Sequence, residues 1–536
     1  MEGYSKAPWI GVFWSYEATE ELPKKAFRVK KTYRNILASR KRSVFRRLGP
    51  KGRPHSLGPV IGGTNVHYEM SARSRAICHG GIGVVDLMVR RLGLCREIDD
   101  RVRVFKRRQP YWESDHVLNI AYNALLGGRR LEDIELRRQD EGFLDALGAG
   151  RLPDPTTAGD FTRRFDQESI VALMEAINRT RARVWRNKAR AQKKQHLMER
   201  AFVDSDGTIA ETFGECKGGM GLSYKGIWGY APLIVSLANT REVLYLVNRP
   251  GNAVSHENWS GWADRAIDLL EGHAKKICLR GDTAFSNTEH FDRWHEKGIE
   301  FIFGYAAYPN MVEIAENLPK MAWGELDRPP KYEVSTEGRA QSVRHKENVI
   351  KAKGYKNLKL RREDVAEFEY RPARYCSRSY RVVVVRKNIS VEKGEAALID
   401  EVRYFFYITN RDDLKAEEVV FLANDRCDQE NVIEQLKNGI GAMRMPVNNL
   451  MSNWAYMVMS ALAWNLKAWM GLMMPEKSRG SEVLKMECRT FLHRLILIPA
   501  QIVRTGRRVV YRLLAYNHWL VDLFDTWERL RKLTPV

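Results

Sequence analysis

Two apolar runs of the chain end in aspartates whose spacing could support metal-ion chemistry. The segment VDSDGT places Asp204 and Asp206 two residues apart, so that in a β-strand both side chains point to the same face. The segment LRGDTAF ends a second run at Asp282, beside a glycine. Neighbouring carboxylates repel each other unless a cation or solvent separates them. Such a cluster suits Mg²⁺, and two such ions can activate a water and stabilise the leaving oxygen of a phosphodiester.

A third acid is available in RCDQENVIEQLKNG (426–439). Arg426, Glu430 and Lys437 are spaced i, i+4 and i+11, which puts them on one face of an α-helix. An acid between two cations suits a metal ligand surrounded by phosphate contacts. A solvated surface helix with an Arg–Glu pair has the same spacing, so the helix alone leaves both interpretations open.

The elements around these residues are predicted to form a ribonuclease H-like mixed sheet. After residue 200 the pattern indicates three strands, a helix, a strand, a helix and a strand, ending near residue 305. In this order the first and fourth strands are neighbours, so Asp206 and Asp282 would meet at their carboxyl ends. The predicted fold class is therefore α/β, with a mainly β insertion and with helical regions before and after the core.

Changes in composition and in the expected secondary structure divide the chain into six expected parts. These are a basic arm and linker (1–63), a helical DNA-binding region (64–198), the first part of the core (199–305), a β-rich insertion (306–415), the core helices bearing the glutamate and the helix after it (416–474), and a C-terminal helical region (475–536).

The charge of the chain favours a polyanionic partner. The net charge is +22. Residues 1–200 contribute 40 − 23 = +17 of it, which favours nucleic acid over a merely basic enzyme. One predicted helix carries a dense cationic stripe that would repel itself without phosphates nearby: Arg181, Arg183, Arg186, Lys188, Arg190, Lys193 and Lys194. Within it, Arg183, Arg186 and Arg190 are the DNA-binding candidates.

The cysteines and the longest apolar stretch indicate in which part of the cell the protein is expected. Seven scattered cysteines without CxxC spacing favour a reducing, cytoplasmic environment over a disulfide framework or a zinc site. Residues 451–474 are apolar, but Asn453, Asn465 and Lys467 interrupt them. The stretch is therefore predicted to be a buried core helix, and no membrane association is expected.

Taken together, these segments resemble the DDE transposases of bacterial insertion sequences, in the branch called transposase DDE domain group 1. The resemblance covers roughly residues 66–515 and rests on the order and spacing of the motifs. Beside the three acidic segments, the matching stretches are LPDPTTAGDFTRRF (152–165), NRPGNAVSHEN (248–258), LAWNLKAW (462–469) and an Arg-rich segment expected to be helical, FLHRLILIPAQIVRTGRRVVYRL.

The resemblance implies roles for particular residues. Asp206, Asp282 and Glu430 would be the catalytic, metal-binding triad, with Mg²⁺ as the ion and Mn²⁺ as a substitute. Arg426 and Lys437 would contact DNA phosphates as members of the family's Tyr-Arg-Glu-Lys signature. The tyrosine position of that signature is Ala423 here, so that contact is either missing or supplied from elsewhere.

Two further DNA contacts are predicted outside the triad. Lys225, in GLSYKGIWGY, lies between the first two strands, where a backbone phosphate could pass, although a solvated lysine loop fits equally well. Related enzymes carry a β-rich insertion before the glutamate helix, and a tryptophan in it can stack on a flipped base. Trp323 is the candidate for that role, against the commoner role of a packing residue.

The function expected from the resemblance is cut-and-paste transposition by a homodimer. Each terminal inverted repeat of the element would be bound and cleaved, and the freed 3′-OH joined to double-stranded target DNA in the nucleoid. Two alternatives keep the fold: a structure-selective nuclease without strand transfer, and an inactive DNA-binding derivative. At the first strand the choice between Asp204 and Asp206 stays open, with Asp206 favoured because it carries the family's threonine two residues later.

Overall fold

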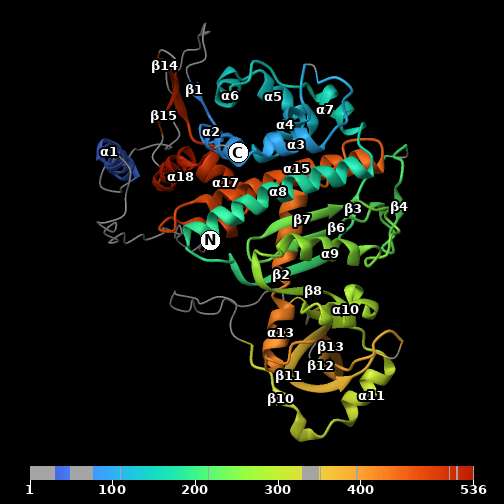
Figure 1. Ribbon diagram of the computed structural model, residues 1–536. Helices are drawn as coiled ribbons and strands as arrows, with labels where there is room; N and C mark the ends of the chain where they lie inside the picture. The colour runs from blue at the N-terminus through green and yellow to red at the C-terminus, as the bar shows by residue number, and fades with distance from the viewer. Residues whose placement is uncertain are drawn as a thin grey trace, which may run out of the picture.

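The computed structural model describes residues 31–48, 76–328 apart from 109 and 215, 349, and 352–534 apart from 373, 394–395, 506–507 and 515–516. Figure 1 shows a helical lobe above a central sheet and a β-rich lobe below it.

A mixed sheet with the predicted order forms the core. Its strands run β7-β6-β2-β8-β9, with β2 antiparallel to β6 and parallel to β8. This is the ribonuclease H-like order, so the predicted strand sequence and the pairing of the first and fourth strands are confirmed. The strands are β2 (Met198–Gly207), β6 (Leu233–Leu237), β7 (Glu242–Val247), β8 (Ala274–Gly281) and β9 (Glu300–Tyr305).

Helices cover the two faces of this sheet. On one face, α9 (Trp259–Leu270) packs on β2, β6 and β8, and Phe291 of α10 (Phe291–Glu296) stacks on Phe301 of β9 at 4.4 Å. On the other face, Val419 and Val420 of α13 (Ala416–Asn424) pack against Cys278 and Ile302. Alternate residues of β2 therefore lie in two different apolar clusters, as expected for a strand buried on both faces.

The insertion extends the core sheet instead of forming a separate one. Phe406 of β13 pairs with Tyr305 of β9, so the insertion strands continue the sheet in the order β9-β13-β12-β11-β10. The mainly β character predicted for this region is confirmed, although one helix precedes its strands. Its elements are α11 (Pro309–Asn317), β10 (Gly324–Glu325), β11 (Lys356–Tyr370), β12 (Tyr380–Lys393) and β13 (Ala396–Thr409).

The helical lobe is built on two long helices that lie side by side (Figure 1). Asp166 caps the first of them, α8 (Gln167–Ala191), and Asp154 caps α7 in the predicted LPDP segment. The second, α15 (Leu450–Met473), is buried along almost its whole length, which confirms the predicted core helix. No helix in the described part of the chain is long and apolar enough to cross a membrane. The smaller helices are α2 (Ile82–Leu92), α3 (Leu94–Arg101), α4 (Glu113–Leu125), α5 (Ile134–Arg138), α6 (Glu141–Leu147) and α7 (Pro155–Thr162).

The C-terminal region departs from the helical prediction. Helices α16 (Gly480–Lys485), α17 (Cys488–Phe491) and α18 (Leu520–Lys532) are present, but residues 500–513 form the strands β14 (Ala500–Thr505) and β15 (Arg508–Leu513). The helix predicted across them is wrong, because the β-branched residues of this segment favour strands. A third strand, β1 (Ala76–Ile77), pairs with β14 and completes the sheet.

The region predicted to be a poorly packed basic arm contains a helix, α1 (Lys31–Leu48). Arg40 donates a hydrogen bond to the Leu513 carbonyl at 2.6 Å, and the Tyr33 ring stacks on Phe524 at 5.4 Å. Most of the described side chains of α1 are exposed, as expected of a poorly packed arm. The rest of the arm and linker lies outside the described residues.

Candidate active site

The sheet brings Asp206 and Asp282 to the same edge. Asp206 is the penultimate residue of β2, and Asp282 directly follows the parallel strand β8, where Ser205 pairs with Gly281. The Asp282 carboxylate turns back to accept a hydrogen bond from the Ala284 amide at 2.9 Å. A side chain at position 281 would lie 2.7 Å from Cβ of Phe285, so this tight turn requires glycine.

The third acid reaches this edge on helix α14 (Cys427–Glu434). Buried Gln429 docks the helix by donating from Nε2 to the Asp204 carbonyl at 3.0 Å and the Ile234 carbonyl at 3.1 Å. Glu430, the next residue, is exposed. Sequence reasoning missed Gln429, because its role depends on two strands that are distant in the chain.

The electrostatics of Asp206 show that the three acids interact. Burial raises the pKa of Asp206 to about 6, Arg426 opposes that shift, and the negative charges of Asp282 and Glu430 add to it. Asp206 Oδ2 lies 3.3 Å from Nη1 of Arg426. The negative charges of Asp282 and Glu430 therefore act on Asp206, and Arg426 compensates them only in part.

The second predicted cation, Lys437, also lies within electrostatic reach of Asp206. Burial lowers the pKa of Lys437; Glu434 and Asp206 oppose the shift, and the charge of Lys225 adds to it. The helix does not run regularly from Arg426 to Lys437, because a π-helical turn (Gln435–Gly439) follows α14. The α-helical spacing predicted for these residues therefore does not hold at its far end, although both cations face the site.

Asp204 has a different environment from Asp206. Its carboxylate is 1% exposed and accepts two hydrogen bonds from Arg280, at 2.6 and 2.9 Å. Arg280 also donates to the Leu422 carbonyl at 2.8 Å and lies 4.7 Å from the centre of the Phe202 ring. Asp204 is thus enclosed in a buried ion pair, which favours Asp206 as the first member of the triad.

The donor chemistry of the site fits a hard divalent cation. Carboxylate oxygens are the preferred ligands of Mg²⁺, and a cation would relieve the repulsion recorded at Asp206. Within the described residues, no three acidic, histidine or cysteine side chains converge closely enough to hold an ion as they stand. Asp206, Asp282 and Glu430 would hold it after side-chain rotation, with Arg426 giving up its contact to Asp206.

The cationic stripe on α8 is only partly a surface feature. Arg181 is fully buried against Glu242. Arg183 is half-buried, with a hydrogen bond to the Leu92 carbonyl at 3.0 Å, whereas Arg186 and Arg190 are exposed. Burial lowers the pKa of Arg186, and the charges of Arg183 and Arg190 lower it further. The charges of these three candidates therefore act on one another, although Arg183 is also paired with Glu97.

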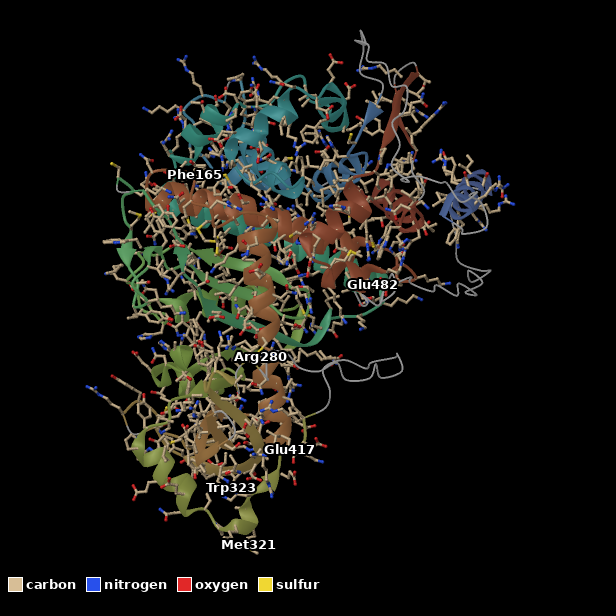
Figure 2. All side chains as sticks on the ribbon, turned by 180° about the vertical axis from the view of Figure 1, so that it is seen from behind. Phe165, Arg280, Met321, Trp323, Glu417 and Glu482 are labelled. Carbon is tan, nitrogen blue, oxygen red and sulfur yellow. The ribbon has the colours of Figure 1, made fainter. Side chains whose placement is uncertain are left out.

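The two remaining DNA-binding candidates occupy different places. Lys225 is exposed near Lys437, beside the triad. Trp323 is half-buried in the β-rich lobe, with the guanidinium of Arg386 4.2 Å from its ring centre, and Figure 2 shows it far from Arg280 of the core. One face of the Trp323 ring is thus already covered.

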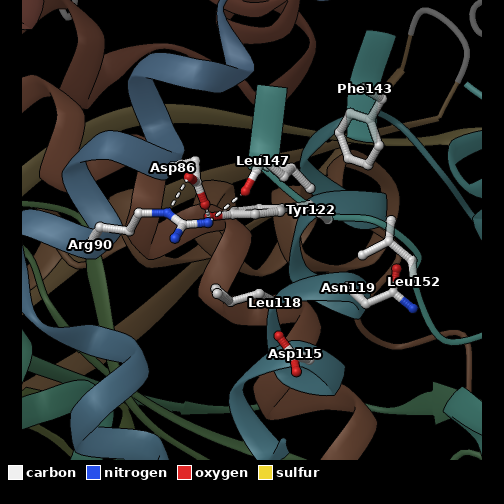
Figure 3. A pocket seen from close by; sticks show the side chains of 10 residues that line it. Asp86, Arg90, Asp115, Leu118, Asn119, Tyr122, Phe143, Leu147 and Leu152 are labelled. Carbon is white, nitrogen blue, oxygen red and sulfur yellow. Dashed lines mark hydrogen bonds and ion pairs between the residues drawn. The ribbon is translucent and has the colours of Figure 1, made fainter. Parts of the chain in front are cut away.

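The helical lobe contains a small pocket, and the hydrogen bonds among its lining residues indicate a structural role for them (Figure 3). The guanidinium of Arg90 bridges Asp86 and the Leu147 carbonyl, both at 2.6 Å, and the Tyr122 hydroxyl donates to Asp86 at 3.1 Å. The polar groups of the pocket therefore partner one another, and burial raises the pKa of Asp86.

Comparisons with known proteins identify the family of the chain. The family model for the transposase DDE domain group 1 matches residues 64–535. Among solved structures, the chain is similar to a piggyBac transposase in a synaptic complex with hairpin DNA, at 8% identity over 77% of this chain and 80% of that chain, with a TM-score of 0.35. No curated protein matches. Because the family match spans nearly the whole chain, the protein belongs to the transposase DDE domain group 1 family.

Proposed function

We propose that the protein cleaves DNA at the terminal inverted repeats of an insertion sequence and joins the freed 3′ ends to target DNA. The observation that carries this proposal is the electrostatic coupling of Asp206, Asp282 and Glu430 at one sheet edge, with Arg426 and Lys437 beside them. A clustered set of carboxylates flanked by cations suits phosphodiester chemistry at a divalent ion.

The residues of the site divide the work between them. The three acids would hold Mg²⁺ or Mn²⁺, which when bound supplies positive charge at the attacked phosphate and lowers the pKa of a water. Arg426 and Lys437 would pair with the DNA phosphates on either side of the scissile bond and so orient it. Gln429 keeps α14 fixed on β2 and β6, so that Glu430 stays within reach of Asp206.

DNA recognition away from the site is assigned to the basic surfaces. Arg183, Arg186 and Arg190 form a cluster whose mutual repulsion phosphates would relieve. Since the two ends of an element must be cut and joined together, a homodimer on DNA in the nucleoid completes the proposal. Trp323 stays a candidate for base stacking, which requires displacement of Arg386 from its ring.

The test uses labelled DNA that carries the repeats flanking the coding region, with Mg²⁺. We expect Asp206→Asn, Asp282→Asn and Glu430→Gln each to reduce end cleavage and strand transfer by ~10³-fold, since ~4 kcal/mol of lost transition-state stabilisation corresponds to that factor. Asp268→Asn, at an exposed acid of α9, is the matched control and should retain both activities.

Three results would contradict the proposal. If Asp282→Asn cleaves DNA as well as the wild-type protein, Asp282 is not a member of the triad. Cleavage by the wild-type protein without any joined product from a pre-cut end would favour the alternative of a structure-selective nuclease. Binding of the repeats without cleavage in either metal would favour the inactive derivative.

A further inference from the structure

A small antiparallel sheet next to the triad exposes several aromatic side chains. It is formed by β3 (Ala210–Glu211), β4 (Gly221–Leu222) and β5 (Trp228–Tyr230), which lie in the connection between β2 and β6 (Figure 1). Phe213 and Tyr224 are each 88% exposed, and Trp228 is 57% exposed. Large apolar side chains exposed together in this way indicate a binding surface.

The tip of this sheet is a tight hairpin whose conformation is well specified. Ser223 donates from its amide to the Ile227 carbonyl at 2.9 Å and accepts from the Gly226 amide at 2.9 Å. Gly226 has φ +72°, which is the left-handed residue required at the end of a three-residue loop. Tyr224 and Lys225 are thereby held at the apex, where the Lys225 ammonium lies 5.4 Å from the centre of the Tyr224 ring.

The base of the hairpin is anchored on two sides of the active site. A Cβ at Gly251, in the NRPGN segment, would lie 2.1 Å from the Gly221 carbonyl oxygen, so two backbones meet there in direct contact. On the other side, the Gly218 amide donates to the Asn448 carbonyl at 2.8 Å. Buried Tyr230 adds a hydrogen bond from its hydroxyl to the Gly218 carbonyl at 3.0 Å. The exposed aromatic rings thus project from a fixed support.

Charge connects the hairpin to the catalytic edge. Lys225 lies close enough to Lys437 for their charges to interact, and Lys437 interacts in turn with Asp206. Two lysines next to each other are stabilised by a shared anion, and a DNA phosphate leaving the triad would meet them in succession. Because β3 begins at Ala210, just after Asp206 near the end of β2, a nucleic-acid strand bound at Asp206 is the occupant that fits this surface.

We propose that Phe213, Tyr224 and Trp228, with Lys225, form an aromatic platform on which unpaired bases next to the cleavage point stack. The cross-strand pair Leu222 and Trp228 gives the platform a flat apolar face, and Lys225 neutralises the backbone of the stacked nucleotides. This inference rests on the proposed function in DNA cleavage and adds a base contact at the hairpin to the one proposed for Trp323 in the β-rich lobe.

The test compares two DNA duplexes of identical sequence, one blunt and one with a short 3′ overhang of thymidines that includes 2-aminopurine. Binding to the full-length protein is measured by fluorescence anisotropy in chelator, so that no cleavage intervenes. We expect the wild-type protein to bind the overhang about 10-fold more tightly than the blunt duplex, because each stacked base contributes that order of affinity. The 2-aminopurine fluorescence should be quenched on binding.

Matched variants separate the platform from general DNA binding. Trp228→Ala and Tyr224→Ala should lose the preference and the quenching but keep the affinity for blunt DNA, whereas Trp228→Phe should keep most of both. Trp112→Ala, at a tryptophan of the helical lobe that is 47% exposed, is the control and should bind like wild type.

The outcomes are distinguishable from failure of the proposed function. Equal binding of the two duplexes by the wild-type protein, or a preference retained in both alanine variants, overturns the platform while the triad stands. Loss of cleavage in the triad variants together with an intact preference supports both assignments. Failure of the wild-type protein to bind either duplex counts against both.

Discussion

Glu242 and Asp206 both lie on the core sheet, but their carboxylates differ in the hydrogen-bond donors that surround them. Glu242, the first residue of β7, is fully buried and accepts hydrogen bonds from four side chains of the lobe and the preceding turn. The donors are Arg181 Nε at 2.9 Å, Trp185 Nε1 at 2.9 Å, Trp469 Nε1 at 2.7 Å and Thr240 Oγ1 at 2.6 Å. Since these donors come from α8 and α15 as well as the turn, the carboxylate joins the helical lobe to the sheet.

Among the described residues, Asp206 has two close donors. They are the Gly207 amide at 2.8 Å and Arg426 at 3.3 Å, while Asp282 and Glu430 add negative charge. A carboxylate saturated by donors serves the fold, and one left short of positive charge is suited to bind a cation from solution. The contrast supports the cation site proposed at Asp206 without reference to any motif.

The largest effect on stability is expected where the carboxylate is saturated. Glu242→Gln leaves Arg181 as a buried charge without its anionic partner, so we expect a loss of about 4–5 kcal/mol in the free energy of unfolding. Urea denaturation followed by tryptophan fluorescence measures it. Glu199→Gln, at an exposed acid paired with Lys275, is the control and should unfold at the wild-type midpoint. If Glu242→Gln is as stable as the wild-type protein, Glu242 does not join the helical lobe to the sheet.

A smaller loss is expected at the other paired aspartate. Asp204→Asn should cost about 3 kcal/mol, because Arg280 keeps its hydrogen bond to the Leu422 carbonyl and its contact with Phe202. The folded variant should retain end cleavage within about tenfold of wild type, since Asp204 supports the site without facing it. Cleavage reduced as far as in Asp206→Asn, at matched folded fraction, would make Asp204 a catalytic acid.

Much of the core could be predicted from local pattern, since its strands are short apolar runs separated by turn residues. The acids at the ends of β2 and β8 followed from the same pattern, because parallel neighbours place their carboxyl ends together. The choice between Asp204 and Asp206 could not be made this way, since both side chains point to the same face. The difference is Arg280, which pairs with Asp204 across the strands.

Features that depend on distant contacts were not predictable. Arg181 has the spacing of a surface stripe, but it turns inward to Glu242, 61 residues later in the chain. The error over β14 and β15 has another origin: the β-branched residues of this segment favour strands, and only the pairing of β14 with Ala76 and Ile77 depends on a distant segment.

The smallest change in stability is expected for a substitution at Asp206 in the presence of chelator. Here the free energy of unfolding should rise instead of fall. The pKa of Asp206 is raised from 3.8 to about 6, so the folded protein without metal is penalised by the ionised carboxylate above pH 6. Asp206→Asn removes that charge and should raise the free energy of unfolding by about 1–2 kcal/mol at pH 7.5, as judged by urea denaturation.

The pH dependence of the gain in stability from Asp206→Asn checks its sign. Well below pH 3.8 the carboxyl is protonated in both the folded and unfolded chains, so the gain from Asp206→Asn should vanish there, grow between pH 3.8 and about 6, and stay level at higher pH. Added Mg²⁺ should stabilise the wild-type protein more than the variant, because binding to the folded state alone adds to its stability. A loss in Asp206→Asn like that of Asp204→Asn would instead place both aspartates among the saturated carboxylates, and the proposed cation site would lose its central ligand.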